Sequence, residues 1–196
     1  MKTYEGSREG NAPELLGNGR IYACDLYFPR QHKEHWNSAW SQAILKVKHR
    51  NVCALDSCTN VIGQLLKESI TITTPHVITF VPPEPAAAHQ QCSVELLAYS
   101  LFRTLSDNSE VSFERLLQSL KPRAIKQHRC TTRWERTENV RGCYAVTQPH
   151  LVLGKTVIVI DDIITSGATM RECQKVLLEA GAMDVIGFVL AKTVGW

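Results

Sequence analysis

The sequence contains no long apolar run, and this sets the first limit on what the protein can be. No stretch approaches the about 20 residues that a membrane-spanning helix requires, although 44% of the 196 residues are hydrophobic and 21% are charged. Residues 1–10 have no apolar stretch after Lys2, so nothing there resembles a secretory signal peptide. We therefore expect a globular cytoplasmic protein with no membrane partner.

Cysteines spaced as in a disulfide framework or a zinc ribbon are also lacking. The chain has seven cysteines, an odd number scattered over positions 24, 53, 58, 92, 130, 143 and 173. Such a set in a chain of this length favours reduced thiols over structural disulfides. His32 and His35, together with Cys53 and Cys58, leave a metal site as an alternative, although their spacing matches no standard zinc pattern.

The sequence has little excess charge of either sign. Its formal net charge of +3 is too small to indicate nucleic-acid binding by itself, because a duplex-binding surface needs a concentrated basic face. The basic residues are unevenly distributed, however, and within 121–141 only Glu135 and Glu138 oppose them. This basic segment is a candidate polyanion site, and an ordinary solvated face is the alternative. Its basic residues are Lys121, Arg123, Lys126, Arg129, Arg133, Arg136 and Arg141.

The length and the lack of internal repeats favour one domain. A chain of 196 residues can bury roughly 70% of its unfolded surface around a single core and is short for two cores. The first twenty residues contain glycine and proline breakers without sustained periodicity. We therefore predict an N-terminal arm or small cap at 1–35, with an extended segment from Tyr22 to Phe28, and a domain at 36–196.

Hydrophobic periodicity in the domain alternates between strand and helix patterns. The run 156–160 is almost continuously apolar and β-branched, as in a parallel strand that is covered on both faces. A capping box of Thr132 and Glu135 predicts the start of a short helix. Strands are predicted at 76–81, 144–146, 156–160 and 185–190, and helices at 36–47, 55–67, 94–105, 132–139 and 169–180. This order predicts a doubly wound α/β fold, with a parallel sheet flanked by helices.

The stretch from Asp161 to Thr169 carries the clearest chemical signal. Two acidic residues follow the apolar strand, at the edge where open α/β sheets place their ligands. The small and hydroxyl-bearing residues Thr165, Ser166, Gly167, Ala168 and Thr169 come next and lead into a helix. The first amide groups of a helix have no internal partners and lie at the positive end of its dipole, so this turn suits a phosphate.

The two acids must face a different part of the same ligand, because Asp161 and Asp162 would repel a phosphate. Sugar hydroxyls donate hydrogen bonds to carboxylates, and Mg²⁺ is often held by one or two carboxylates and several waters. Asp161 and Asp162 are therefore candidate Mg²⁺ ligands, directly or through water. The ligand implied by the whole stretch is a phosphorylated sugar.

These residues resemble the signature of type I phosphoribosyltransferases, in which a hydrophobic strand, two acids and two apolar residues precede a Thr-Thr-Gly-x-Thr-like turn. Ser166 stands here in place of the second threonine. The resemblance implies the fold of that family. It also implies that Asp161 and Asp162 bind the ribose hydroxyls of 5-phosphoribosyl-1-pyrophosphate (PRPP) and that residues 165–169 hold its 5-phosphate.

A wider resemblance is to the competence protein F branch of that family. The stretch 135–144 (ERTENVRGCY) is similar to a motif of the branch, and 81–82 (VP) is similar to the start of its pyrophosphate loop. The resemblance implies a pyrophosphate loop that includes Pro82 and Pro83. The segment 121–136 takes the place of the flexible catalytic loop. The zinc ribbon of the branch is not expected, because no suitably spaced pair of cysteines precedes Cys53.

The resemblance further implies an enzyme of nucleotide metabolism, which transfers the phosphoribosyl group to a nitrogenous base or amine and releases pyrophosphate. Mg²⁺ and the side chains of Arg123, Lys126 and Arg136 would stabilise the charge of the leaving group. The stretch 89–93 (HQQCS) lacks the arginine and glycine of the branch. A non-catalytic PRPP sensor is therefore an alternative, as is an accessory protein of DNA uptake that binds nucleic acid. In each of these cases the protein could form a homodimer.

Overall fold

The computed structural model describes residues 20–29, 37–72, 75–87, 91–105, 110–122, 130 and 132–194. The strands of this part of the chain are β1 (Arg20–Tyr27), β2 (His76–Phe80), β3 (Val111–Phe113), β4 (Leu117–Ser119), β5 (Tyr144–Val146), β6 (Thr156–Ile164) and β7 (Asp184–Thr193). The helices are α1 (Ala39–Lys48), α2 (Val52–Ser69), α3 (Ser93–Leu105), α4 (Arg133–Val140) and α5 (Ala168–Glu179), with 3₁₀ turns at Pro85–Ala87 and Pro149–Leu151. Among these residues, no helix has both the length and the apolar character needed to cross a membrane.

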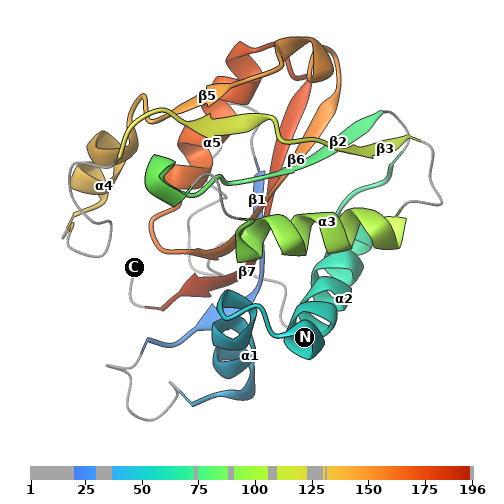
Figure 1. Cartoon of the computed structure of the whole chain (residues 1–196), viewed down its shortest axis with the longest axis vertical. Helices are drawn as coiled ribbons and strands as arrows, with labels where there is room; N and C mark the ends of the chain where they lie inside the picture. Colours follow the sequence, from blue (N-terminus) through green and yellow to red (C-terminus); the bar gives the residue numbers. More distant parts are fainter. Residues whose placement is uncertain are drawn as a thin grey trace, which may run out of the picture.

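A five-stranded sheet in the order β1-β7-β6-β2-β3 forms the centre of the molecule (Figure 1). All four neighbouring pairs in it are parallel, whereas β4 and β5 form a separate antiparallel pair. The first five residues of β6 are buried, as expected of a strand covered on both faces. The prediction of an α/β fold with a parallel sheet flanked by helices is thus confirmed.

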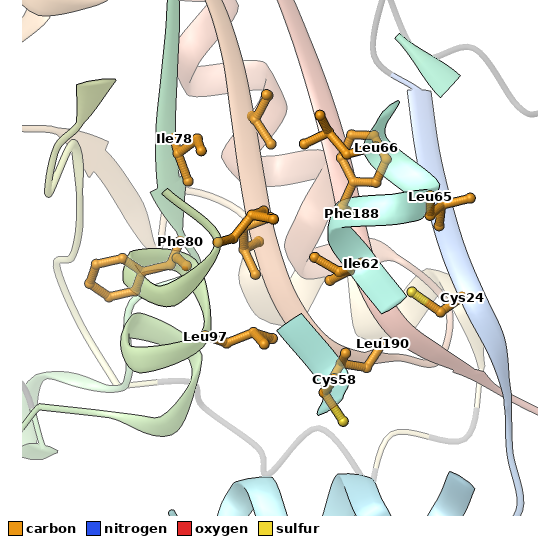
Figure 2. Close-up of a cluster of buried hydrophobic side chains, with 14 of the residues drawn as sticks. Cys24, Cys58, Ile62, Leu65, Leu66, Ile78, Phe80, Leu97, Phe188 and Leu190 are labelled. Atoms are coloured by element: carbon orange, nitrogen blue, oxygen red, sulfur yellow. The ribbon is translucent and has the colours of Figure 1, made fainter. Parts of the chain in front are cut away.

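Each face of the sheet has its own hydrophobic core. Helices α1, α2 and α3 cover one face, where Ile62, Leu66 and Leu97 lie against strand residues such as Phe188 (Figure 2). Helix α5 and the β4-β5 pair cover the other face, where Met170 and its neighbours on α5 pack against β6 and β7. The alternation of side chains along β6 supplies both cores, because successive residues of a strand point to opposite faces.

The two crossover helices next to the centre of the sheet lie on opposite faces. Helix α3 follows β2 and packs in the first core, whereas α5 follows β6 and packs in the second. The chain therefore leaves the carboxyl ends of the adjacent strands β2 and β6 in opposite directions. This divergence opens a crevice at the topological switch point, where open α/β sheets bind their ligands.

Strand β1 lies within the stretch 1–35 that was predicted as an N-terminal arm or cap. It pairs with β7 from Arg20 to Tyr27, so the sheet begins before residue 36. Tyr22 of β1 stacks on Phe188 of β7, with ring centroids 5.1 Å apart. Residues 1–19 and 30–36, which include Trp36, lie outside the described part of the chain.

Several boundaries differ from the predicted ones. The strand predicted to end at residue 160 continues to Ile164, because its pairing with β7 persists through Ile164 and Lys192. The two acids therefore lie on the strand itself and not in a loop after it. The capping box of Thr132 and Glu135 at the start of α4 is confirmed.

The sheet is predicted to lose much of its stability when Phe188 is truncated. Phe188 is fully buried, and a Phe→Ala change in a core typically costs about 3–5 kcal/mol in the free energy of unfolding. We expect a loss of that size for Phe188→Ala in urea unfolding followed by circular dichroism. The exposed Met183 offers a control, since Met183→Ala is expected to change the value by less than about 0.5 kcal/mol. Similar losses in both variants would contradict the assigned core.

Candidate functional site

A cavity of about 770 Å³ lies at the carboxyl ends of β2 and β6. It brings together the stretch 161–169 with Pro82, Pro83 and Arg136, which are separate in the sequence. The other residues that line it are Tyr27, Pro29, Lys48, Val81, Glu84, Cys92, Val94, Met170 and Thr193. The cavity thus occupies the switch point and is bounded by the segments that follow both central strands.

The turn at 165–167 joins the end of β6 to the start of α5. Gly167 has a positive φ of 75° and is the N-cap residue, so it has no side chain that could accept from the first amides of α5. Ser166 Oγ accepts a hydrogen bond from Ala168 N at 3.4 Å, and Thr165 Oγ1 lies 3.5 Å from Thr193 Oγ1. Hydroxyls and helical amides therefore meet at one wall of the cavity, which is the chemistry that a phosphate requires.

Arg171 fixes the shape of this turn from the first part of α5. Its guanidinium donates a hydrogen bond through Nη2 to the carbonyl oxygen of Ser166. A Cβ atom on Gly167 would lie 2.9 Å from Arg171 Nη1. The left-handed backbone therefore favours glycine at this position, and a side chain there would also require the Arg171 guanidinium to shift.

The two acids carry carboxylates that are held by the backbone of the following residue. Asp161 Oδ1 accepts a hydrogen bond from Asp162 N at 2.8 Å, and Asp162 Oδ1 accepts one from Ile163 N at 2.6 Å. Asp162 Oδ2 also forms an ion pair with Lys48 Nζ at 3.3 Å. Lys48 was not among the predicted site residues, because no motif in the sequence connects α1 with the strand that it contacts.

Basic side chains lie in and around the cavity. Arg136, on the inner face of α4, is 4% exposed and lines the cavity, and burial lowers the pKa of its guanidinium. Burial, followed by the nearby charges of Arg133 and Arg171, lowers the pKa of the Lys192 ammonium. Arg141, in contrast, forms an exposed pair with Glu138 at 2.7 Å. Among the described residues of the basic segment, Arg136 therefore faces inward, whereas Arg141 lies on a solvated surface.

Two of the predicted catalytic residues cannot be placed. Arg123 and Lys126 lie outside the described residues, as do His32 and His35 of the alternative metal site. Cys53 and Cys58 lie on α2, where a separation of five residues puts them roughly 140° apart around the helix. Cys53 is exposed and Cys58 is buried, so the pair cannot bind one metal ion. Within the described ranges, no group of three or more His, Cys, Asp or Glu side chains is arranged to hold a metal.

Residues 104–193 match the family model described as the phosphoribosyl transferase domain. The matched stretch extends from the end of α3 to the end of β7, and it includes Arg136, both acids and the turn at 165–167. It does not include α1, α2 or β2. The match therefore falls in the C-terminal half of the chain and contains the predicted signature.

Curated relatives are similar over a short stretch. Ribose-phosphate pyrophosphokinase 4 and the chloroplastic ribose-phosphate pyrophosphokinase 3, both of Oryza sativa subsp. japonica, are each 50% identical to this chain over 36 residues. That stretch is 18% of this chain, and 11% and 9% of the two relatives. The chain thus matches about a tenth of the length of these curated relatives.

Solved structures show limited overall similarity. The glutamine PRPP amidotransferase from B. subtilis, complexed with ADP and GMP, has a TM-score of 0.41 at 20% identity, with 69% of this chain and 26% of that chain covered. The adenine phosphoribosyltransferase from Leishmania donovani has a TM-score of 0.46 at 12% identity, with 92% and 86% covered. The assignment of the α/β fold rests on the sheet and helices of this chain.

Replacement of Gly167 by alanine is predicted to impair both stability and phosphate binding. A left-handed φ costs a residue with a side chain roughly 1–2 kcal/mol, and the new Cβ would also displace Arg171 from the turn. Gly154 is a matched control, since its φ is 69° but nothing lies within 4 Å of a Cβ there. Both alanine variants should lose stability in urea unfolding. Only Gly167→Ala should also lose affinity for ribose 5-phosphate in calorimetry, and equal affinities in the two variants would contradict a phosphate site at 165–167.

Proposed function

We propose that the protein binds PRPP with Mg²⁺ in this cavity and transfers its phosphoribosyl group to a nitrogenous base or amine. In this reaction the bond from the anomeric carbon to pyrophosphate breaks, a bond to the acceptor nitrogen forms, and the nitrogen loses a proton. The observation that carries the proposal is that a hydroxyl-rich turn and two acids meet in one cavity at the switch point. The family match at 104–193 includes both features.

The turn supplies the binding site for the 5-phosphate. The amides of the first turn of α5 have no partners within the helix, and the helix dipole is positive at this end. The hydroxyls of Thr165, Ser166 and Thr169 line the same wall and can donate to phosphate oxygens. This part of the site needs no charged side chain to hold a phosphate, although the guanidinium of Arg171 contacts the turn through the carbonyl oxygen of Ser166.

The acids supply the binding site for the ribose. Asp161 and Asp162 precede Thr165 on an extended strand with a rise of about 3.3 Å per residue, so Asp162 lies roughly 10 Å from the turn. A carboxylate at that distance is well placed for the hydroxyls of a sugar whose 5-phosphate is bound at 165–167. Because each carboxylate has one oxygen held by a backbone amide, its orientation is already set before the ligand arrives.

The charges in the cavity suit a ligand that arrives with a divalent cation. Among the described residues, the carboxylates of Glu84, Asp161 and Asp162 line it together with the cationic side chains of Lys48 and Arg136. A polyanion such as PRPP would be repelled by this set unless further positive charge accompanied it. Carboxylate oxygens are preferred ligands of Mg²⁺, so Asp161 and Asp162 would hold the ion directly or through water. When bound, Mg²⁺ would neutralise charge on the pyrophosphate.

The protein's own contribution to the chemistry is positioning and electrostatics. Arg136 is buried and lines the cavity, so its charge is screened less than that of an exposed arginine. It would stabilise the negative charge that develops on the leaving pyrophosphate. Arg123 and Lys126 are proposed to add to this from the segment 123–129. No side chain is required to act as a nucleophile.

A PRPP sensor without turnover is the second candidate function. The segment that follows β2 lines the cavity with Pro82, Pro83, Glu84, Cys92 and Val94, and contributes a carboxylate but no cation from its described residues. This side of the cavity therefore offers little stabilisation to the negative charge of pyrophosphate. A reaction that releases pyrophosphate is favoured by such stabilisation. The sensor would bind the same ligand through the same turn and acids.

Binding of PRPP is predicted to require both acids. The variant that combines Asp161→Asn and Asp162→Asn loses the charges that would hold the ribose hydroxyls and Mg²⁺, so calorimetry in the presence of Mg²⁺ should detect no PRPP binding. Asp56 is an exposed carboxylate on α2, and Asp56→Asn should bind PRPP like the wild type. Unchanged binding in the double variant would reject the proposed site.

Release of pyrophosphate is predicted when the protein is incubated with Mg²⁺, PRPP and a panel of nucleobases and amines. An enzyme should release pyrophosphate with at least one acceptor, and the Asp161→Asn and Asp162→Asn variant should release none. A coupled pyrophosphate assay measures this directly. Tight binding of PRPP without release under any of these conditions would reject the transferase and leave the sensor.

A further inference from the structure

Lys48 belongs to α1, which packs in the first core, and it contacts an acid of the proposed ribose site. It lies in the last turn of α1, and its ammonium is 3.3 Å from Asp162 Oδ2. Its side chain is 41% exposed and lines the cavity. An ammonium has three donors, so the ion pair with Asp162 leaves donors that can act on a ligand in the cavity.

Helix α1 is fixed firmly enough to place this ammonium. Ile44 and Val47 of α1 are buried in the first core. Trp40 Nε1 donates a hydrogen bond to the carbonyl oxygen of Leu190 in β7 at 3.1 Å, and Phe28 N donates one to Ser41 Oγ at 3.2 Å. The helix is thus tied to β7 and to the end of β1, and the position of Lys48 follows from that attachment.

The ion pair lies at the acid end of the site and away from the phosphate turn. Asp162 precedes Thr165 by three residues of extended strand, which separates them by roughly 10 Å. A sugar with its 5-phosphate in the turn and its hydroxyls at the acids directs its anomeric carbon away from the turn. Lys48 therefore lies at the end of the site away from the 5-phosphate, as the anomeric carbon does in this orientation.

We infer that Lys48 is a PRPP-binding residue, whose ammonium bridges Asp162 and the pyrophosphate of the bound ligand. This inference rests on the proposed function. The segment after β2 supplies no cation to the cavity from its described residues. The inference assigns that cation to α1, which lies outside the residues that match the phosphoribosyl transferase domain. The bridge would hold the ribose acid and the leaving group in one geometry.

A simpler role for Lys48 makes a different prediction. If the ammonium serves only to hold Asp162 in place, its removal weakens every ligand that uses Asp162, whether or not the ligand carries pyrophosphate. If the ammonium contacts the pyrophosphate, its removal weakens PRPP much more than ribose 5-phosphate. The ratio of the two affinities therefore separates the two roles.

The experiment compares PRPP and ribose 5-phosphate by calorimetry in the presence of Mg²⁺. Lys48→Ala should weaken PRPP about tenfold or more, because it removes a charge-assisted hydrogen bond, and should change the affinity for ribose 5-phosphate less than about twofold. Lys48→Arg should retain most of the PRPP affinity. Lys46 is exposed on the same helix and does not line the cavity, so Lys46→Ala controls for loss of charge and should match the wild type.

Three results would overturn the inference. Equal weakening of both ligands in Lys48→Ala would reduce Lys48 to a support for Asp162, and unchanged affinity for PRPP would remove it from the site. A weakening of PRPP in Lys46→Ala equal to that in Lys48→Ala would show a general charge effect. A wild-type protein that binds neither ligand would instead reject the proposed function itself. Thermal unfolding of each variant verifies that the fold is intact.

Discussion

The parallel pairing of β6 with β2 on one side and β7 on the other is the constraint on which the site depends. It brings the carboxyl ends of β2 and β6 to one edge of the sheet, and the helices that follow these strands then leave on opposite faces. The crevice between them exists only because the two crossovers diverge. The turn at 165–167, the two acids and the segment after β2 are all positioned by this one arrangement.

The pairing of β6 with β7 also extends beyond the apolar run at 156–160. It continues through the acids to Ile164, so Asp161 and Asp162 belong to a rigid strand instead of a loop. Alternation along that strand directs successive side chains to opposite sides, yet both residues line the cavity at its end. A ligand that binds them meets groups whose backbone is already fixed by the sheet, which lowers the entropy lost on binding.

The parts of the site that are contiguous in sequence could be predicted, and the parts that depend on packing could not. The acids, the turn and the start of α5 follow one another within nine residues, so their pattern alone indicated a sugar phosphate. Arg136 was found through a motif, but its burial against the cavity depends on how α4 packs. Lys48 gave no signal, since its role arises from a contact between α1 and β6 that hydrophobic periodicity cannot specify. The closeness of Arg171 to Gly167 was likewise visible only in three dimensions.

This division has a physical origin in the strand that carries the acids. The interior of β6 is buried on both faces, and a buried strand cannot carry lysine or arginine without a large desolvation cost. Among the described residues, the cations that line the cavity come from other elements, α1 and α4. The positions of these cationic side chains depend on how α1 and α4 pack. The hydrogen bond from Trp40 to β7 thus helps to fix the position of the Lys48 charge in the cavity, although Trp40 packs against the first core and does not line the cavity.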